Sequence, residues 1–236
     1  SRCHFPAHIF HCRNPLIAVL VKMKPICYIV GAAPTKTTIK PPRSGDLIIS
    51  ADAGYLTLKE QGLHPDIAVG DFDTAPAPTG VNTVVLPSVK DDTDTVYAVK
   101  TGLEHGYERF LIYGALGGAR FSHSFATVQT LTYILDRGGR AVACGDGYAA
   151  LVLRCGRVDF RAGCSGFFSV FSLDTESRGV SVSGAKYNVT DVTLTNSFPL
   201  GVSNEFTGKA AGVSVCDGTL LVIYECTDPL SVLYEW

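Results

Sequence analysis

The sequence lacks the features that mark membrane-spanning and nucleic-acid-binding chains. No stretch approaches the roughly 18 to 20 consecutive apolar residues that a membrane-spanning helix needs. No run of lysine and arginine exceeds two residues, and the formal net charge is −2. A nucleic acid or an anionic membrane surface is therefore not expected as a partner. With 236 residues, of which 18% are charged, the chain is long enough for one large or two small globular domains.

The common phosphate-binding and cysteine motifs are also absent. The chain has no G-x-x-x-x-G-K-[ST] loop and no complete G-x-G-x-x-G, which excludes phosphate chemistry of the Walker or dinucleotide type. None of the eight cysteines forms a C-x-x-C pair, and several stand inside apolar runs. A secreted disulfide framework is one explanation. Thiols dispersed through predicted strands instead favour small buried side chains in a reducing compartment, so we expect a cytoplasmic protein.

Methionine is nearly absent: Met23 is the only one, and the first predicted strand begins soon after it. Residues 1–22 hold three basic residues and no acid, and without them the chain has 17 basic against 22 acidic residues, a net charge of −5. We therefore interpret residues 1–22 as a non-native or disordered extension. Two cysteines and three histidines within residues 3–12 resemble a metal cluster. Their spacing matches no common zinc finger, so no physiological metal site is expected there.

From residue 23 to about residue 147 the sequence alternates between strand-like and helix-like segments. Short apolar, β-branched runs are followed by segments in which apolar residues have helical spacing and which end at glycine. This alternation predicts βαβ units with a mostly parallel, Rossmann-like sheet flanked by helices. The predicted strands are 26–30, 46–50, 67–73, 83–87, 109–116 and 140–146, and the predicted helices are 55–61, 93–105 and 124–137.

The pattern changes near residue 148. Residues 148–236 consist of short runs rich in Val, Phe, Thr and Ser, separated by Gly, Asn and Asp at hairpin spacing. No helix-length pattern occurs there, which predicts an antiparallel β-sandwich or barrel. We therefore expect an α/β domain over residues 23–147 and an all-β domain over residues 148–236.

Aspartates stand where the predicted parallel strands end. Asp52 follows the second strand, and Asp71 and Asp73 end the third. At the start of the second helix stand Asp91, Asp92 and Asp94. Carboxyl ends of parallel strands open on one edge of the sheet, so these carboxylates are expected to converge. Like charges at close range need a cation, and oxygen ligands suit Mg²⁺ bound to substrate phosphates. Each acid alone has an alternative as a turn former or helix cap, and Asp94 is expected to cap its helix.

A glycine-rich turn, GALGGARFSH at 114–123, connects a predicted strand to a predicted helix. Gly117 and Gly118 allow the backbone to approach a ligand closely, and Arg120 can hold a phosphate through two hydrogen bonds. A purely structural turn explains the glycines equally well. His123, near the start of the helix, is a candidate for proton transfer, although a structural role or a phosphate contact is commoner for a histidine that opens a helix.

Together these segments resemble the thiamine pyrophosphokinase family. The order SADAG, GDFDT, KDDTD and GALGGARFSH is similar to the family's ADGG or ADAG, GDFDS, KDxTD and GGRxDH, and the all-β part adds GAKY at 184–187 and SNE at 203–205. The likeness covers residues 26 to about 225, and the combination is specific although no single motif is. It implies ATP as donor, thiamine as acceptor, AMP and thiamine diphosphate as products, Mg²⁺ as cofactor, and a homodimer whose thiamine pocket is shared between subunits.

The resemblance also assigns roles to individual residues. The α/β domain would bind ATP and magnesium, and the all-β domain would bind thiamine and the second subunit. A flat cationic ligand suits an aromatic wall with a few hydrogen bonds, here Tyr187 with Ser203 and Asn204. The implied metal ligands are Asp71, Asp73, Asp91 and Asp94; the implied catalytic residues are Asp71, Asp73, Asp94 and Arg120; and the implied nucleotide contacts are Asp52, Gly54, Lys90, Asp91, Gly118, Ser122 and His123.

Two positions of the glycine-rich turn depart from the family pattern. Ala119 stands where a glycine is common, and Ser122 where many members have an aspartate. Serine can bind Mg²⁺ or a phosphate, but it cannot act as a general base at neutral pH. In the expected reaction the thiamine hydroxyl attacks the β-phosphorus of ATP, with Asp71 or Asp73 as proton acceptor. Two alternatives stay open: a catalytically weak thiamine- or nucleotide-binding protein, and a pyrophosphokinase or phosphohydrolase acting on another heterocyclic alcohol.

Overall fold

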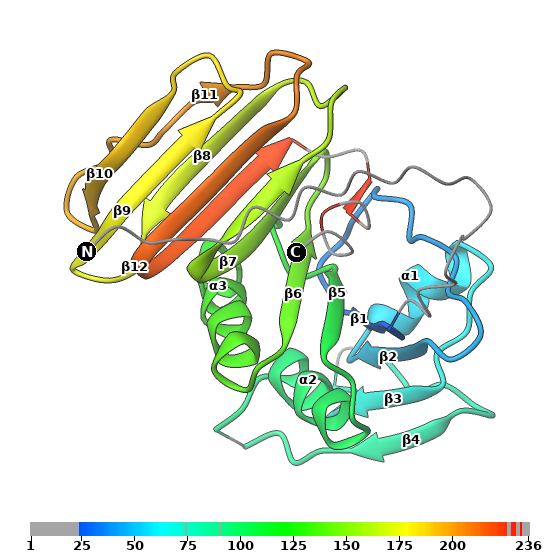
Figure 1. Ribbon diagram of the computed structural model, residues 1–236. Helices are drawn as coiled ribbons and strands as arrows, with labels where there is room; N and C mark the ends of the chain where they lie inside the picture. The colour runs from blue at the N-terminus through cyan, green and yellow to red at the C-terminus, as the bar shows by residue number, and fades with distance from the viewer. Residues whose placement is uncertain (1–23, 74, 90, 226–227, 230–231, 233–236) are drawn as a thin grey trace.

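The computed structural model describes residues 24–225 except 74 and 90, together with 228, 229 and 232. The predicted extension at 1–22, including the cysteines and histidines of residues 3–12, therefore lies outside the described residues, and so does Lys90. Within the described part, the strands form one twelve-stranded sheet (Figure 1).

The first half of the chain forms a parallel sheet with the strand order β4-β3-β2-β1-β5-β6. The chain runs outward from β1 to β4 and then returns to place β5 on the other side of β1, so the strand order reverses there. Open α/β sheets bind ligands at such a reversal, beyond the carboxyl ends of the strands. The strands are β1 (Cys27–Val30), β2 (Leu47–Ala51), β3 (Ile67–Gly70), β4 (Asn82–Val85), β5 (Arg109–Tyr113) and β6 (Arg140–Cys144).

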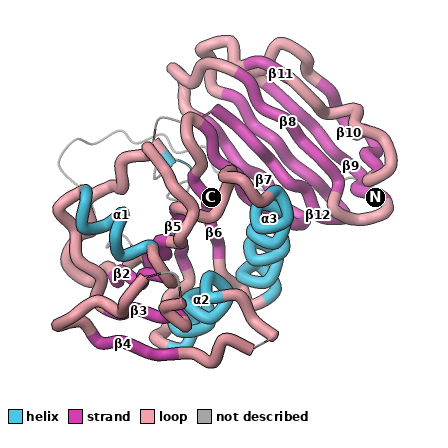
Figure 2. Tube along the Cα trace, turned by 180° about the vertical axis from the view of Figure 1, so that it is seen from behind, coloured by secondary structure: helices cyan, strands magenta, loops and turns pink. Residues whose placement is uncertain are grey.

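Helices cover both faces of this parallel sheet. On one face Ile29 and Ile112 pack with Val99 of α2 and Leu131 of α3, and Figure 2 shows these two helices side by side. On the other face Leu58 of α1 belongs to the second core cluster. The helices are α1 (Gly54–Glu60), α2 (Asp94–Glu104) and α3 (Phe121–Asp136). The predicted parallel sheet flanked by helices is confirmed.

The second half is antiparallel and continuous with the first. β6 turns back into β7 (Tyr148–Phe160), and β7 pairs along most of its length with β12 (Ala211–Glu225). β12 divides its other edge between β8 and β9, so two layers form around a cluster of aromatic rings. The predicted sandwich is confirmed, but the sequence patterns did not indicate that β6 and β7 join it to the parallel sheet. The remaining strands are β8 (Phe167–Ser172), β9 (Glu176–Ser183), β10 (Val189–Thr195) and β11 (Asn204–Glu205).

Two local predictions were wrong. Thr93 rather than Asp94 caps α2, because the Thr93 side chain accepts a hydrogen bond from the Val96 N–H at 3.2 Å and Asp94 is already helical. Helix α3 begins at Phe121, before the predicted Ser124, whose hydroxyl accepts a hydrogen bond from the Gly117 N–H at 2.9 Å. Among the described residues, no helix is long and apolar enough to cross a membrane.

Candidate active site

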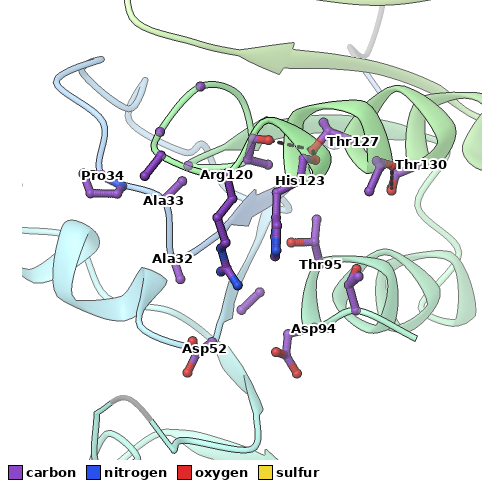
Figure 3. A pocket seen from close by; sticks show the side chains of 18 residues that line it. Ala32, Ala33, Pro34, Asp52, Asp94, Thr95, Arg120, His123, Thr127 and Thr130 are labelled. Atoms are coloured by element: carbon purple, nitrogen blue, oxygen red, sulfur yellow. Dashed lines mark hydrogen bonds between the residues drawn. The ribbon is translucent and has the colours of Figure 1, made fainter. Parts of the chain in front are cut away.

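A cavity of about 270 Å³ lies beyond the carboxyl ends of β1, β2 and β5, where the strand order reverses. Its walls come from segments far apart in the sequence: residues 32–34, 51–52, 93–95, 114–115, 117–120 and the first turns of α3. Figure 3 shows Asp52 and Asp94 on one side, with the side chains of Arg120 and His123 extending toward them from the other. The cavity therefore has carboxylates facing cationic or polar groups.

The turns that follow β2 and β3 are packed backbone to backbone. The Asp52 N–H donates to the Val69 carbonyl at 2.7 Å, and a Cβ on Gly70 would lie 2.9 Å from the Asp52 Cα. A Cβ on Gly54 would lie 1.9 Å from the Val30 carbonyl oxygen, so only glycine fits there. Asp52 has a φ of +49°, a conformation that aspartate tolerates better than most residues. These constraints fix where the Asp52 carboxylate stands.

Three aspartates bring their carboxylate oxygens together. Oxygens of Asp52, Asp71 and Asp73, here called the acidic cluster, lie within 4.8 Å of one another. Burial is the main cause that raises the pKa of Asp52, and nearby carboxylates, Asp94 first among them, raise that pKa further against the opposing effect of a hydrogen bond from Ala53. The Asp52 Oδ1 atom is buried and has no hydrogen-bond partner among the described residues. Such an oxygen among like charges fits a cation, and an all-oxygen ligand set suits Mg²⁺.

The three aspartates of the KDDTD segment lie in different surroundings. Asp94 lines the cavity at the start of α2. Asp91 is exposed and is found neither among the described residues that line the cavity nor in the acidic cluster. Asp92 forms an ion pair with Lys100 at 2.5 Å. Of the two predicted metal ligands in this segment, the structure therefore places only Asp94 near the acidic cluster.

Arg120 and His123 line the cavity on the side of α3. Arg120 immediately precedes the helix, and no ion pair is formed by its guanidinium within the described part of the chain. Gly117 and Gly118 have φ values of +77° and +79°, which glycine adopts without strain. Ser122 is exposed and does not belong to the described cavity lining.

The three predicted thiamine contacts lie in the other half of the molecule. Tyr187 is 60% exposed. The Asn204 side chain is engaged with the backbone: its Oδ1 accepts from the Tyr187 N–H at 3.0 Å and its Nδ2 donates to the Tyr187 carbonyl at 2.7 Å. Ser203 has a φ of +59°, and its N–H donates to the Ser169 hydroxyl at 3.0 Å. Asn204 thus holds Tyr187 in place, a role that the sequence did not indicate.

A hollow of about 130 Å³ lies next to Tyr187 in the all-β half. Its lining includes Tyr187, Val189, Leu200 and Val202, which we call the apolar groove. Leu200 is 62% exposed and Val202 46% exposed. Large apolar side chains exposed together indicate an interaction surface.

The sequence analysis missed one wall of the cavity. Ala32, Ala33 and Pro34 follow β1 and line the cavity beside the glycine-rich turn. They carry no charged or hydrogen-bonding side chain, so residue type alone gives no signal. Their position directly after a buried strand was the available signal, because ligands bind beyond the carboxyl ends of parallel strands.

Known structures share this architecture. A thiamine pyrophosphokinase from Bacillus subtilis is similar over 86% of this chain and 100% of its own, with 21% sequence identity and a TM-score of 0.76. Thiamin pyrophosphokinase from Geobacillus thermodenitrificans gives 24% identity and a TM-score of 0.73 over 86% and 99% of the two chains. Thiamin pyrophosphokinase from Candida albicans has 14% sequence identity and a TM-score of 0.70, over 86% of this chain and 90% of its own. At these identities the likeness shows the fold. No curated protein sequence matches the chain.

The solved structures show the fold, and two family models identify the family. The description "Thiamin pyrophosphokinase, catalytic domain" matches residues 43–143, and "Thiamin pyrophosphokinase, vitamin B1 binding domain" matches residues 157–220. The two matches follow one another along the chain and together take in well over half of it. The predicted resemblance is therefore confirmed. The chain belongs to the thiamin pyrophosphokinase family, and its activity is the ATP-dependent transfer of a pyrophosphoryl group to thiamine.

Proposed function

We propose that the cavity binds ATP with Mg²⁺, and that the acidic cluster together with Asp94 holds the metal ion at the phosphates. The acidic cluster carries this proposal: its three carboxylates lie within 4.8 Å of one another, and the buried Asp52 Oδ1 has no hydrogen-bond partner among the described residues. Without a cation this arrangement is repulsive. When bound, Mg²⁺ would neutralise phosphate charge and stabilise the charge that develops during transfer.

Arg120 supplies the positive charge that the chain itself brings to the phosphates. Its side chain extends from the start of α3 toward Asp52 and Asp94 (Figure 3), where it donates hydrogen bonds to phosphate oxygens. His123 provides a second phosphate contact from the same side. Asp71 or Asp73 accepts the proton of the thiamine hydroxyl as its oxygen bonds to the β-phosphorus and AMP leaves.

Thiamine, in this proposal, binds between the cavity of one copy of the chain and the apolar groove of a second copy. Tyr187 offers an aromatic face to the cationic ring of thiamine, and the nearby Ser203 hydroxyl offers a hydrogen bond. A second copy would also cover Leu200 and Val202, which are exposed in the single chain. The chain would therefore work as a homodimer, with each active site built from both subunits.

A cytoplasmic location is part of the same proposal. Among the described residues, Cys27 and Cys155 are free thiols, and Cys27 is buried. Burial raises the pKa of Cys27 far above its usual range, which keeps that side chain in the thiol form. Free and buried thiols are typical of a reducing compartment.

Replacing Asp71 by Asn tests the metal-binding role. AMP release from ATP and thiamine should fall by at least about a hundredfold, because one carboxylate of the cluster loses its charge. Asp92→Asn is the matched control, since Asp92 lies in the adjacent acidic segment but pairs with Lys100 outside the cluster. The control should retain its turnover, and circular dichroism should show both variants folded. Full turnover by Asp71→Asn would contradict the assigned role.

A further inference from the structure

Asp146, in the turn between β6 and β7, gathers a set of hydrogen bonds from a distant segment. Its Oδ1 accepts from the Thr35 hydroxyl at 2.7 Å, from the Lys36 N–H at 2.8 Å and from the Thr37 N–H at 3.1 Å. The Thr37 hydroxyl donates to the neighbouring Gly145 carbonyl at 2.8 Å. The Thr35 hydrogen bond is the main cause that lowers the pKa of Asp146, so the carboxylate stays charged at neutral pH. One side chain therefore holds three consecutive residues.

The segment that Asp146 holds continues directly into the cavity wall. Ala32, Ala33 and Pro34 line the cavity, and the Ala33 N–H donates to the Gly114 carbonyl at 3.0 Å. The connection between β1 and β2 has no regular secondary structure, so the backbone hydrogen bonds of a helix or a sheet do not fix its path. Pro34 thus stands between an anchor at the end of β5 and an anchor at Asp146. Without the Asp146 carboxylate, residues 34–36 would be held only at their ends, by the Ala33 hydrogen bond and by those of Thr37 with Gly145 and Gln61, so this wall would be less constrained.

The same turn also contacts the glycine-rich turn, which lies beside this wall of the cavity. A Cβ on Gly117 would lie 3.5 Å from the Tyr148 hydroxyl, so the tyrosine side chain lies next to the glycine-rich turn. The Tyr148 ring packs against Gly145, where a Cβ would lie 2.4 Å from the ring. Residues 145–148 are therefore in contact with two neighbouring backbone segments, the one that continues into Ala32–Pro34 and the glycine-rich turn.

We propose that Asp146 is a positioning residue for the nucleotide. The Asp146 side chain fixes the position of Ala32–Pro34, which form one side of the ATP-binding cavity, although Asp146 itself does not line the cavity. This inference rests on the proposed binding of ATP in the cavity. Because the held wall carries no reactive group, its displacement weakens ATP binding while leaving chemistry and thiamine binding intact.

Asp146→Ala should raise the KM for ATP about tenfold, equivalent to about 1.4 kcal/mol, with kcat and the KM for thiamine close to those of the unaltered chain. Asp146→Asn retains the Oδ1 acceptor and should recover most of this loss. Thr35→Val removes the shortest of the hydrogen bonds to Asp146, together with the one that the Thr35 hydroxyl accepts from the Thr37 N–H at 3.1 Å, and should raise the KM for ATP about threefold. Calorimetry with ATP and Mg²⁺, without thiamine, should show the same order of affinities.

Asp46→Ala provides the matched control. Asp46 holds the far end of the same connection, where its carboxylate accepts from the Ile26 and Arg43 N–H groups, each at 2.8 Å. Its replacement should lower the melting temperature without changing the KM for ATP. An equal rise in KM in both alanine variants, or no rise in Asp146→Ala and Thr35→Val, would overturn the proposal.

Calorimetry separates this inference from the proposed function. If the unaltered chain binds ATP but releases no AMP, the proposed catalysis fails, and the affinity difference between the unaltered chain and Asp146→Ala still decides the positioning role. If the unaltered chain does not bind ATP at all, both proposals are wrong. Should Asp146→Ala not fold, Thr35→Val, which deletes a single hydroxyl, gives the decisive measurement.

Discussion

The acidic cluster and the apolar groove are incomplete in opposite ways. At the cluster, close backbone packing at Gly54 and Gly70 holds Asp52 in a position where neighbouring carboxylates repel its negative charge. At the groove, Tyr187 and Leu200 expose apolar surface without any such electrostatic conflict. The first site gains stability when a cation binds, and the second gains stability when a surface covers it. Removing the charge or the apolar side chain should therefore have different consequences.

The largest effect is expected from Asp52→Asn. Turnover should fall by about a hundredfold or more, because the buried carboxylate of the cluster is lost. In metal-free buffer, however, the melting temperature should rise by about 2 °C, because the variant removes like-charge repulsion while asparagine still tolerates a positive φ. Initial rates of AMP release measure the first effect, and differential scanning calorimetry with EDTA and with Mg²⁺ measures the second.

The pH dependence of the metal-free chain sharpens the same prediction. The pKa of folded Asp52 is raised above the ordinary value of 3.8. Its contribution to stability is therefore present below the ordinary value and is lost as pH rises through the raised pKa. Asp52→Asn should lack this loss. Asp136→Asn, which removes a surface ion pair with Arg154, is the control and should leave the loss unchanged. A lower melting temperature for Asp52→Asn in EDTA would show that no repulsion is relieved.

The sequence predicted the cluster better than the groove, and the reason is topological. Asp52 and Asp71 could be brought together from the sequence because the carboxyl ends of parallel strands share one edge. Asp91 and Asp94 could not be told apart in this way, since only the start of α2 decides which of them lines the cavity. No comparable rule exists for the antiparallel half, where the contact of Asn204 with Tyr187 depends on how β11 meets the loop between β9 and β10.

An intermediate effect is expected from Leu200→Asp in the apolar groove. If a second copy covers the groove, a buried charge at this position should raise the dimer dissociation constant by about a hundredfold. Activity should fall with dilution in parallel, because each thiamine site needs both copies. Sedimentation velocity measures the association. Val85→Asp, on β4 of the α/β half and 69% exposed, is the control and should leave it unchanged. A monomeric unaltered chain with full activity would contradict the shared site.

The smallest effects distinguish Ser203 from Asn204, two consecutive residues next to the apolar groove. Asn204→Ala removes the hydrogen bonds to the Tyr187 backbone, so it should lower the free energy of unfolding by about 1 kcal/mol and raise the KM for thiamine indirectly. The Ser203 hydroxyl makes no hydrogen bond among the described residues, so Ser203→Ala should leave stability unchanged. If that hydroxyl contacts thiamine, Ser203→Ala should still raise the KM for thiamine about fivefold. Urea unfolding and initial rates at saturating ATP measure both quantities. A raised KM without any loss of stability in Asn204→Ala would instead place Asn204 in direct contact with thiamine, because positioning of Tyr187 cannot be lost while the hydrogen bonds that provide it leave no trace in the unfolding curve.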